Sequence, residues 1–257
     1  MISAIVLAKD EEANLDRCLA SLQGLQEVIV YDDESTDKTT AIAKKYGATV
    51  ITHASHQDFA AQRNAAMKAA KYDWVLFVDA DEELSAGLQK ELSKLQNEIT
   101  SRNDIAYRIK RADIWWGQKL TRGEVYTAAH TGIIRLVNRT QGTWQGKVHE
   151  EFKTDGNVGT LDHEIIHRPH PTVTSFLEHI NEYSSMRADE LAKQGKRTNI
   201  FELIIYPFFK FLYNYILKAG YVEGAAGFSY AFFMSFHSFL VRSKLYVTQY
   251  KATHTEV

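Results

Sequence analysis

The first eighty positions alternate between short apolar runs and longer stretches that repeat apolar side chains at helical spacing. The apolar runs, rich in β-branched residues, are residues 3–8, 27–32, 48–53 and 74–80. The helix-like stretches between them are residues 11–23, 35–47 and 58–71. Strands that alternate with helices are typical of βαβ units, and parallel strands buried on both faces read as continuous apolar runs. The pattern predicts an α/β fold with a mixed, mostly parallel sheet and flanking helices.

The middle of the chain continues this sheet with longer excursions. Residues 105–111 and 131–139 are strand-like, and the loop between them contains Trp115 and Trp116. We therefore expect residues 1–170 to form the α/β domain, with a helical extension over residues 171–257.

The composition indicates a reducing compartment and a basic C-terminal tail. Cys18 is the single cysteine, so no intramolecular disulfide can form. The N-terminal apolar run lacks a basic leader and is predicted to be the first strand rather than a signal peptide. The net charge of −2 is uneven, because residues 193–251 carry 8 Lys and Arg against 2 Asp and Glu. The acidic body is the half expected to carry the chemistry.

Carboxylates follow three of the predicted strands. These acidic residues are Asp10, Glu11 and Glu12 after the first strand, Asp32, Asp33, Glu34 and Asp37 after the second, and Asp79, Asp81, Glu82 and Glu83 after the fourth. In parallel sheets ligands bind beyond the carboxyl ends of the strands. One acidic turn is a common turn or cap, but three at one edge indicate a site.

Asp79 and Asp81 would project to the same side if the strand continued, about 6–7 Å apart. Two carboxylates at that distance repel by about 2–3 kcal/mol at an effective dielectric constant near 20. We expect a positive group between them, and oxygen ligands favour Mg²⁺ or Mn²⁺. The alternative is an exposed helix start, which is the favoured interpretation for Glu82 and Glu83. The first 116 residues contain no glycine-rich phosphate loop, which disfavours a dinucleotide oxidoreductase or a P-loop NTPase.

The runs AIVLAKDEEANLDRCLASL, EVIVYDDESTDKT and QRNAAMKAAKYDWVLFVDADEEL resemble the family 2 inverting glycosyltransferases of the Rossmann-like GT-A fold. The later segments IAYRIKRADIWWGQ, GIIRLVNR, GKVHEEF and IIHRPHP resemble the branch of lipopolysaccharide inner-core β-1,4-glucosyltransferases that act on the first heptose. This resemblance implies a nucleotide-sugar-binding half near residues 1–100 and an acceptor half near residues 101–170.

The resemblance also implies roles for individual residues. Nucleotide-sugar contacts would come from Glu11, Asp32, Asp33, Arg63 and Asp79. The segment from Asp79 to Asp81 matches the family's D-x-D motif, which makes Asp81, with Asp79, the expected metal ligand.

Further implied roles lie later in the chain. His167 matches a further ligand position, and Glu150, with Glu151 as the second choice, matches the catalytic base. Where the family often has glycine before Ser35, this chain has Glu34, which is less able to take unusual backbone angles.

The basic tail is predicted to be helical and to contact a membrane surface. Its first helix carries an apolar face of Phe201, Ile204, Ile205, Phe208, Phe209, Leu212 and Ile216, and a polar face of Glu202, Tyr206, Lys210, Asn214 and Lys218. Pro207 marks a start or bend of this helix. Residues 224–241 lack Asp, Glu, Lys and Arg but contain three serines and His237, so they make a poor membrane span. A helical pair in the interface against anionic lipid is expected, and internal packing or dimerisation is the alternative.

These expectations together describe a hexosyltransferase that needs Mg²⁺ or Mn²⁺ and uses a UDP-hexose, best UDP-glucose, as donor. Its acceptor would be a lipid-anchored saccharide, the inner-core heptose. The enzyme would be cytoplasmic and peripheral to the inner membrane, a homo-oligomer is compatible, and no nucleic acid polymer is expected as partner. The alternatives are a glycosyltransferase with a polyprenyl-linked or protein acceptor and a non-catalytic nucleotide-sugar-binding membrane scaffold.

Overall fold

The computed structural model describes residues 1–54, 58–146, 150–169 and 172–253, with side chains as far as Lys251. The chain divides into two compact units, of which the first comprises Met1–Ala112 and His130–Arg168 and the second Asp113–Ala129 and Pro169–Val257. The break after Arg168 lies near the expected boundary at residue 170. The segment Asp113–Ala129, which the sequence pattern assigns to the α/β domain, belongs instead to the second unit.

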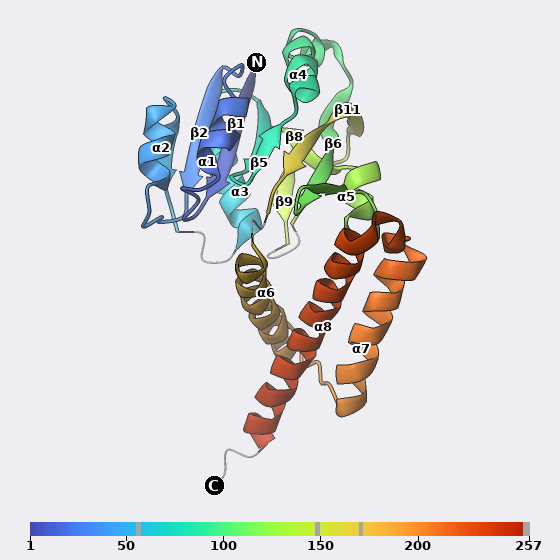
Figure 1. The fold of residues 1–257 in the computed structure, drawn as a ribbon. Coiled ribbons are helices and arrows are strands. Elements are labelled where there is room, and N and C mark those ends of the chain that lie inside the picture. The colour runs from blue at the N-terminus through green and yellow to red at the C-terminus, as the bar shows by residue number, and fades with distance from the viewer. Residues whose placement is uncertain (55–57, 147–149, 170–171, 254–257) are drawn as a thin grey trace. The chain divides into compact units, whose positions relative to one another are not determined.

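The strands and helices predicted for the first eighty residues are confirmed (Figure 1). They are β1 (Ile2–Ala8), α1 (Leu15–Ser21), β2 (Glu27–Asp32), α2 (Thr39–Lys45), β3 (Thr49–Thr52), α3 (Phe59–Ala69) and β4 (Trp74–Asp79). The four strands pair in parallel in the order β3-β2-β1-β4. Their carboxyl ends therefore lie along one edge of the sheet, where the acidic residues follow.

Antiparallel strands complete the sheet. The remaining elements of the first unit are β5 (Glu82–Leu84), α4 (Ala86–Glu98), β6 (Asp104–Trp115, whose last three residues belong to the second unit), β8 (Ile133–Asn138), β9 (Thr143–Gln145), β10 (Glu151–Lys153) and β11 (Asn157–His167). Among the described residues, nine strands form one sheet in the order β3-β2-β1-β4-β8-β6-β11-β5, with β7 (Gln118–Leu120) paired to the end of β6. The α/β prediction with a mixed sheet is confirmed.

Successive strand residues point to opposite faces of the sheet, and the parallel strands are apolar at nearly every position. Both faces are therefore apolar, and helices cover both. On one face, α1, α2 and α4 pack their apolar residues against β1 and β4, as with Leu19 and Leu92. On the other face, α3 and the β9–β10 hairpin contribute Met67, Trp144 and Phe152. Figure 1 shows α1 and α2 beside β1 and β2. The core therefore has two layers, one on each side of the sheet.

The second unit is helical. It contains α6 (Val173–Lys193), α7 (Ile200–Leu212) and α8 (Gly224–Thr253), with a π-helical turn at Tyr213–Leu217. The short α5 (Tyr126–His130) also belongs to it, except for the last residue, His130. Its core surrounds Trp115, whose ring lies 4.7 Å from Phe176 and 5.2 Å from Tyr230. α7 begins at Ile200, where Asn199 caps the helix, and Pro207 lies inside it. The expectation that the helix could start at Pro207 is therefore wrong, because the side chain of Asn199, eight residues earlier, already caps the first turn.

Candidate active site

The loops after β1 and β2 interlock at the carboxyl edge of the sheet. Oδ1 of Asp10 accepts a hydrogen bond from the backbone N of Thr36 at 2.7 Å, and the backbone N of Glu11 donates to Oγ1 of Thr39 at 2.8 Å. Asp10 and Glu34 have φ values of 53° and 56°, in the left-handed region. Glu34 thus takes the backbone angle for which glycine is better suited, at a cost of about 1–2 kcal/mol. The bonds between the loops hold this conformation.

The expected nucleoside contacts lie along this edge. Asp32 is buried at the end of β2 and accepts hydrogen bonds from the backbone N of Ser35, while Asp33 faces Lys9 at 3.4 Å. Burial raises the pKa of Glu11, and the negative charges of Asp81 and other nearby carboxylates add to this, against a hydrogen bond from a neighbouring amide. The carboxylates that follow β1 and β4 are therefore close enough to interact electrostatically.

A buried arginine, Arg135 of β8, lies at the centre of the acidic cluster. Its Nη2 atom donates to Oδ2 of Asp79 at 2.5 Å and to Oε1 of Glu82 at 2.7 Å. The backbone N of Asp79 also donates to Oε2 of Glu82 at 3.0 Å. β8 runs antiparallel to β4, with Leu136 opposite Leu76, so its early residues reach the carboxyl end of β4. The protein itself thus supplies a positive group to Asp79, but it lies between Asp79 and Glu82 rather than between Asp79 and Asp81.

These contacts set the ionisation of the cluster. Burial favours the neutral form of Asp79, but the charges of Arg135 and then Arg63 outweigh it and hold the pKa of Asp79 well below its ordinary value. Burial raises the pKa of Glu82, partly opposed by Arg135. Burial alone would lower the pKa of Arg135, yet Asp79 and Glu82 raise it, so the guanidinium stays charged.

Asp81 and His167 form a separate pair beside this cluster. Nε2 of His167 lies 3.2 Å from Oδ2 of Asp81, and both side chains are mostly buried. β11 pairs with β5 so that His167 is opposite Glu82, which brings the imidazole to the turn after β4. The structure therefore brings together two of the three expected metal ligands. Asp79 is turned to arginine instead.

Arg63 of α3 connects the acidic cluster to the expected base. Its Nε atom lies 2.9 Å from Oε1 of Glu150, and its Nη2 atom lies 3.5 Å from Oδ1 of Asp79. The guanidinium packs over the rings of Phe77 and Trp144, 4.9 and 5.0 Å from their centroids. A carboxylate–arginine–carboxylate chain thus joins Glu150 to the end of β4.

Glu151, the second choice for the base, lies elsewhere. Its side chain is 70% exposed and pairs with Lys153 on the same strand. The hydrogen bond and charge of Lys153 lower the pKa of Glu151. Successive strand residues point to opposite faces, and the structure directs Glu150, not Glu151, toward Arg63. His149, considered as an orienting residue for the base, lies outside the described residues.

The interpretation of Glu82 and Glu83 as an exposed helix start is wrong. Both lie on β5, Glu82 is fully buried, and α4 begins only after Ser85, whose hydroxyl caps Leu88. Glu83 pairs with Arg168 at 3.1 Å. Sequence reasoning did not anticipate Arg135, although a signal existed: a single charge inside the apolar run IIRLVN predicts a buried cation, which needs an acidic partner.

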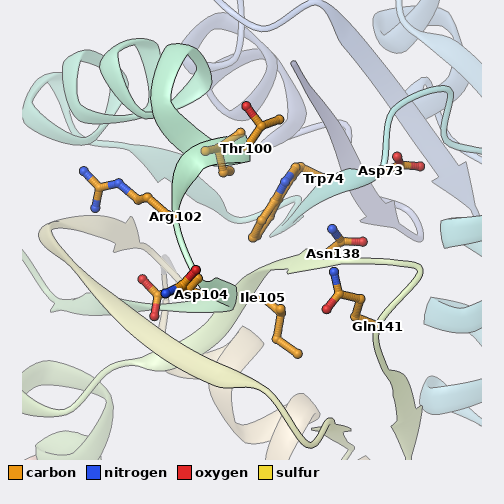
Figure 2. A pocket seen from close by; sticks show the side chains of 10 residues that line it. Asp73, Trp74, Thr100, Arg102, Asp104, Ile105, Asn138 and Gln141 are labelled. Atoms are coloured by element: carbon orange, nitrogen blue, oxygen red, sulfur yellow. The ribbon is translucent and has the colours of Figure 1, made fainter.

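A hollow of about 410 Å³ lies at the other end of β4. Trp74 begins β4 and lines this hollow together with Arg102, Asp104 and Asn138, as Figure 2 shows. Since Asp79 ends the same strand, the hollow is separated from the acidic cluster by the length of β4. Ligands of parallel sheets bind at the carboxyl ends, so the hollow in Figure 2 is not the candidate active site.

An acidic edge on a mixed α/β sheet, with a second carboxylate held beside it, is the candidate active site, and comparison with known proteins identifies the class of protein. Residues 3–143 match the model of glycosyl transferase family 2. The chain is 31% identical over 255 residues to an uncharacterized glycosyltransferase of Rickettsia typhi (strain ATCC VR-144 / Wilmington), covering 95% of this chain and 86% of that protein. The chain therefore belongs to glycosyltransferase family 2.

Two further similarities stand beside this assignment. The chain is 29% identical over 253 residues to the lipopolysaccharide core biosynthesis glycosyltransferase LpsC of Rhizobium meliloti (strain 1021), covering 95% of this chain and 92% of that protein. Among solved structures, residues 1–349 of S. aureus TarS in complex with UDP-GlcNAc align with a TM-score of 0.49 and 15% identity, covering 98% of this chain and 92% of that one.

Proposed function

We propose that this family 2 glycosyltransferase transfers a hexose from a UDP-hexose, best UDP-glucose, to a heptose of the lipopolysaccharide or lipooligosaccharide inner core, with inversion at the anomeric carbon. The similarity to LpsC, which is named for lipopolysaccharide core biosynthesis and which the chain matches over most of its length, supports the acceptor class. The donor sugar and the heptose rest on the resemblance of the later sequence segments.

The observation that carries the proposal is the chain of contacts from Asp79 through Arg63 to Glu150. It connects a carboxylate of the D-x-D segment to a second carboxylate contributed from a distant part of the sequence. An inverting transferase needs this combination, because the donor's diphosphate and the acceptor's hydroxyl must meet at one sugar carbon.

In the proposed reaction the acceptor hydroxyl oxygen bonds to the anomeric carbon from the face opposite the diphosphate. The bond from that carbon to the diphosphate oxygen breaks, and the leaving nucleoside diphosphate takes the electron pair. The hydroxyl proton passes to Glu150 as general base. Arg63 holds Oε1 of Glu150, so Oε2 is the atom that accepts the proton.

On the donor side, Glu11, Asp32 and Asp33 contact the nucleoside from the loops after β1 and β2. Asp79 is a positioning residue for this edge, because Arg135 holds both of its carboxylate oxygens. Nη1 of Arg63 is buried without a hydrogen-bond partner among the described residues.

A divalent cation fits part of this site. Oδ2 of Asp81 and Nε2 of His167 are 3.2 Å apart, close enough to share one ion, whereas Asp79 is occupied by arginine. Within the described residues, no three His, Cys, Asp or Glu side chains form a metal site on their own. Mg²⁺ binds through one or two protein ligands together with substrate phosphates, so two ligands suffice. When bound by Asp81 and His167, Mg²⁺ or Mn²⁺ would supply charge stabilisation for the leaving diphosphate.

A lipid-anchored acceptor places the enzyme at a membrane. We propose a cytoplasmic enzyme at the cytoplasmic face of the inner membrane, with the helical second unit as the contact, and a homo-oligomer remains compatible with this arrangement.

The test is a panel of nucleotide sugars incubated with the full chain and a heptose-terminated lipid-linked core acceptor. Transfer from one UDP-hexose, lost in Glu150→Gln and retained in Glu151→Gln, is the expected result. Transfer only to a polyprenyl-linked or protein acceptor would reassign the acceptor. If the protein bound the donor but neither transferred the sugar nor hydrolysed the donor, it would be a non-catalytic scaffold. Normal turnover by Glu150→Gln would overturn the base assignment.

A further inference from the structure

Helix α7 presents its polar side chains to the protein and its apolar side chains outward, the reverse of a helix on a water-soluble protein. Each polar side chain of α7 has a partner within the second unit. Lys210 lies 2.7 Å from Glu124, and Tyr206 lies under the guanidinium of Arg242 at 4.0 Å. Glu202 accepts a hydrogen bond from Thr198 at 3.0 Å.

The polar side continues into the turn after α7. Asn214 is buried and donates to Oε2 of Glu124 at 2.8 Å. Ser235 of α8 donates its hydroxyl to the backbone carbonyl of Pro207 at 2.6 Å. Four of the five residues of the predicted polar face are thus buried or half-buried, and Tyr206 is 46% exposed while its ring contacts Arg242.

The outward side is a continuous apolar surface. On α7 its exposed members are Ile200, Phe201, Ile204, Ile205, Phe208 and Phe209, with Ile216 and Leu217 in the turn that follows. Phe201 is 73% exposed and Leu217 75%. Phe228 and Phe232 of α8 extend this surface, since the ring of Phe228 lies 5.7 Å from that of Phe211. We call this set of residues the α7 outer face.

The α7 outer face is apolar along the helix and the turn that follows it. Contiguous exposed apolar patches on soluble proteins are usually small and mark interaction sites. By length and composition, Ile200–Leu217 and Gly220–Lys251 could each cross a membrane, and only 6% and 22% of their apolar windows is buried within the protein.

We propose that the α7 outer face is embedded in the hydrocarbon of a lipid bilayer, so that α7 and α8 attach the enzyme integrally rather than by adsorption. A helix that lies in the interface turns its polar face to water. In hydrocarbon, polar side chains face the interior of the helical bundle and pair with one another, and α7 follows this second pattern. The inference deepens the proposed function, on whose lipid-anchored acceptor it rests, and it replaces the expectation of charge-driven adsorption to anionic lipid.

Extraction from membranes of cells that express the full chain separates the two modes of attachment. At ~1 M salt, where the screening length falls to ~3 Å, and in alkaline carbonate, the protein is expected to stay with the membrane, and detergent is expected to release it. Ile204→Glu with Phe208→Glu should lower membrane partitioning roughly a hundredfold or more, because two carboxylates are costly in hydrocarbon. The control Ile204→Leu with Phe208→Leu should partition as the unmodified chain does. Release by salt alone would overturn the proposal.

A depth measurement identifies what covers the face. Cys18 is buried, so Ile204→Cys can be labelled with an environment-sensitive fluorophore, and Lys90→Cys on the exposed side of α4 is the water-facing control. Acyl-chain quenchers in vesicles should quench the label at residue 204 and not that at residue 90. A label at residue 204 that is shielded without quenching, in a detergent-free dimer, would show that a second copy covers the face. UDP-glucose binding by calorimetry in detergent tests the donor site independently, so failure of one proposal is distinguishable from failure of the other.

Discussion

The Nε atom of Arg63 lies 2.9 Å from Oε1 of Glu150, across 87 positions of sequence. Arg63 is 7% exposed at its side chain, and the rings of Phe77 and Trp144 fix the plane of its guanidinium. Arg63 therefore fixes the position of Glu150, and the two aromatic rings fix the position of Arg63. This relationship gives Arg63 a role as a positioning residue for the proposed base.

Replacing Arg63 with glutamine is expected to lower kcat about a hundredfold, because a displaced base costs that much even when the change in position is near 1 Å. The KM for the donor should change much less than kcat. Arg139→Gln is the control, since Arg139 pairs with Asp73 beside the other end of β4. If donor KM rose while kcat at saturation stayed constant, Arg63 would act only as the nucleotide contact that the sequence predicted.

Removing Glu82 is expected to destabilise the fold. Glu82→Ala deprives the buried guanidinium of Arg135 of one of its two carboxylates and should lower the free energy of unfolding by about 3 kcal/mol. Glu83→Ala, one residue on, removes a partly exposed pair with Arg168 and should cost about 1 kcal/mol or less. Urea unfolding of the two variants measures the difference. Equal stability of the two would show that the buried network contributes nothing.

The metal requirement should depend on Asp81. Asp81→Asn is expected to weaken Mn²⁺-dependent binding of UDP-glucose at least about tenfold, since one of two protein ligands loses its charge. Glu83→Gln should bind as the unmodified chain does, because Glu83 is engaged by Arg17 and Arg168. Calorimetry with and without chelator provides the measurement. Chelator-insensitive binding in the unmodified chain would rule out the metal site.

Glu91 predicts a pH-dependent contribution to stability. Burial favours the neutral carboxyl, but hydrogen bonds from the backbone of Asp162 and from His163 outweigh it and lower the pKa of Glu91. A lowered folded-state pKa stabilises the fold above the ordinary carboxyl range, and this stabilisation is lost as the pH falls through the folded-state pKa.

Glu91→Gln should therefore cost about 1–2 kcal/mol at neutral pH. The difference from the unmodified chain should shrink as the pH falls below the ordinary value of 4.5. Urea unfolding over a series of acidic pH values measures it. A difference that grew toward acid would contradict the assigned direction of the pKa shift.

Much of the first unit could be predicted because its signals are local. The four parallel strands follow from apolar runs, and Glu11, Asp32 and Asp79 follow those strands directly, so their shared edge was predictable. The partners of the acids were not, because Arg135 arrives on an antiparallel strand that pairs with β4 from far along the sequence. The turn after Asp79 also breaks the strand geometry that would have put Asp81 on the same side.

The sequence by itself determined the alternation of strands and helices, the acidic edge and the two faces of α7, since each depends on the spacing of neighbouring residues. Only the tertiary structure decided that Arg135, rather than a metal ion, faces Asp79 and that Glu150, rather than Glu151, contacts Arg63. It also decided that the polar side chains of α7 contact the rest of the second unit. These outcomes depend on contacts between residues distant in sequence, where burial forces each charge to find a partner and leaves apolar side chains outside when no core remains to take them.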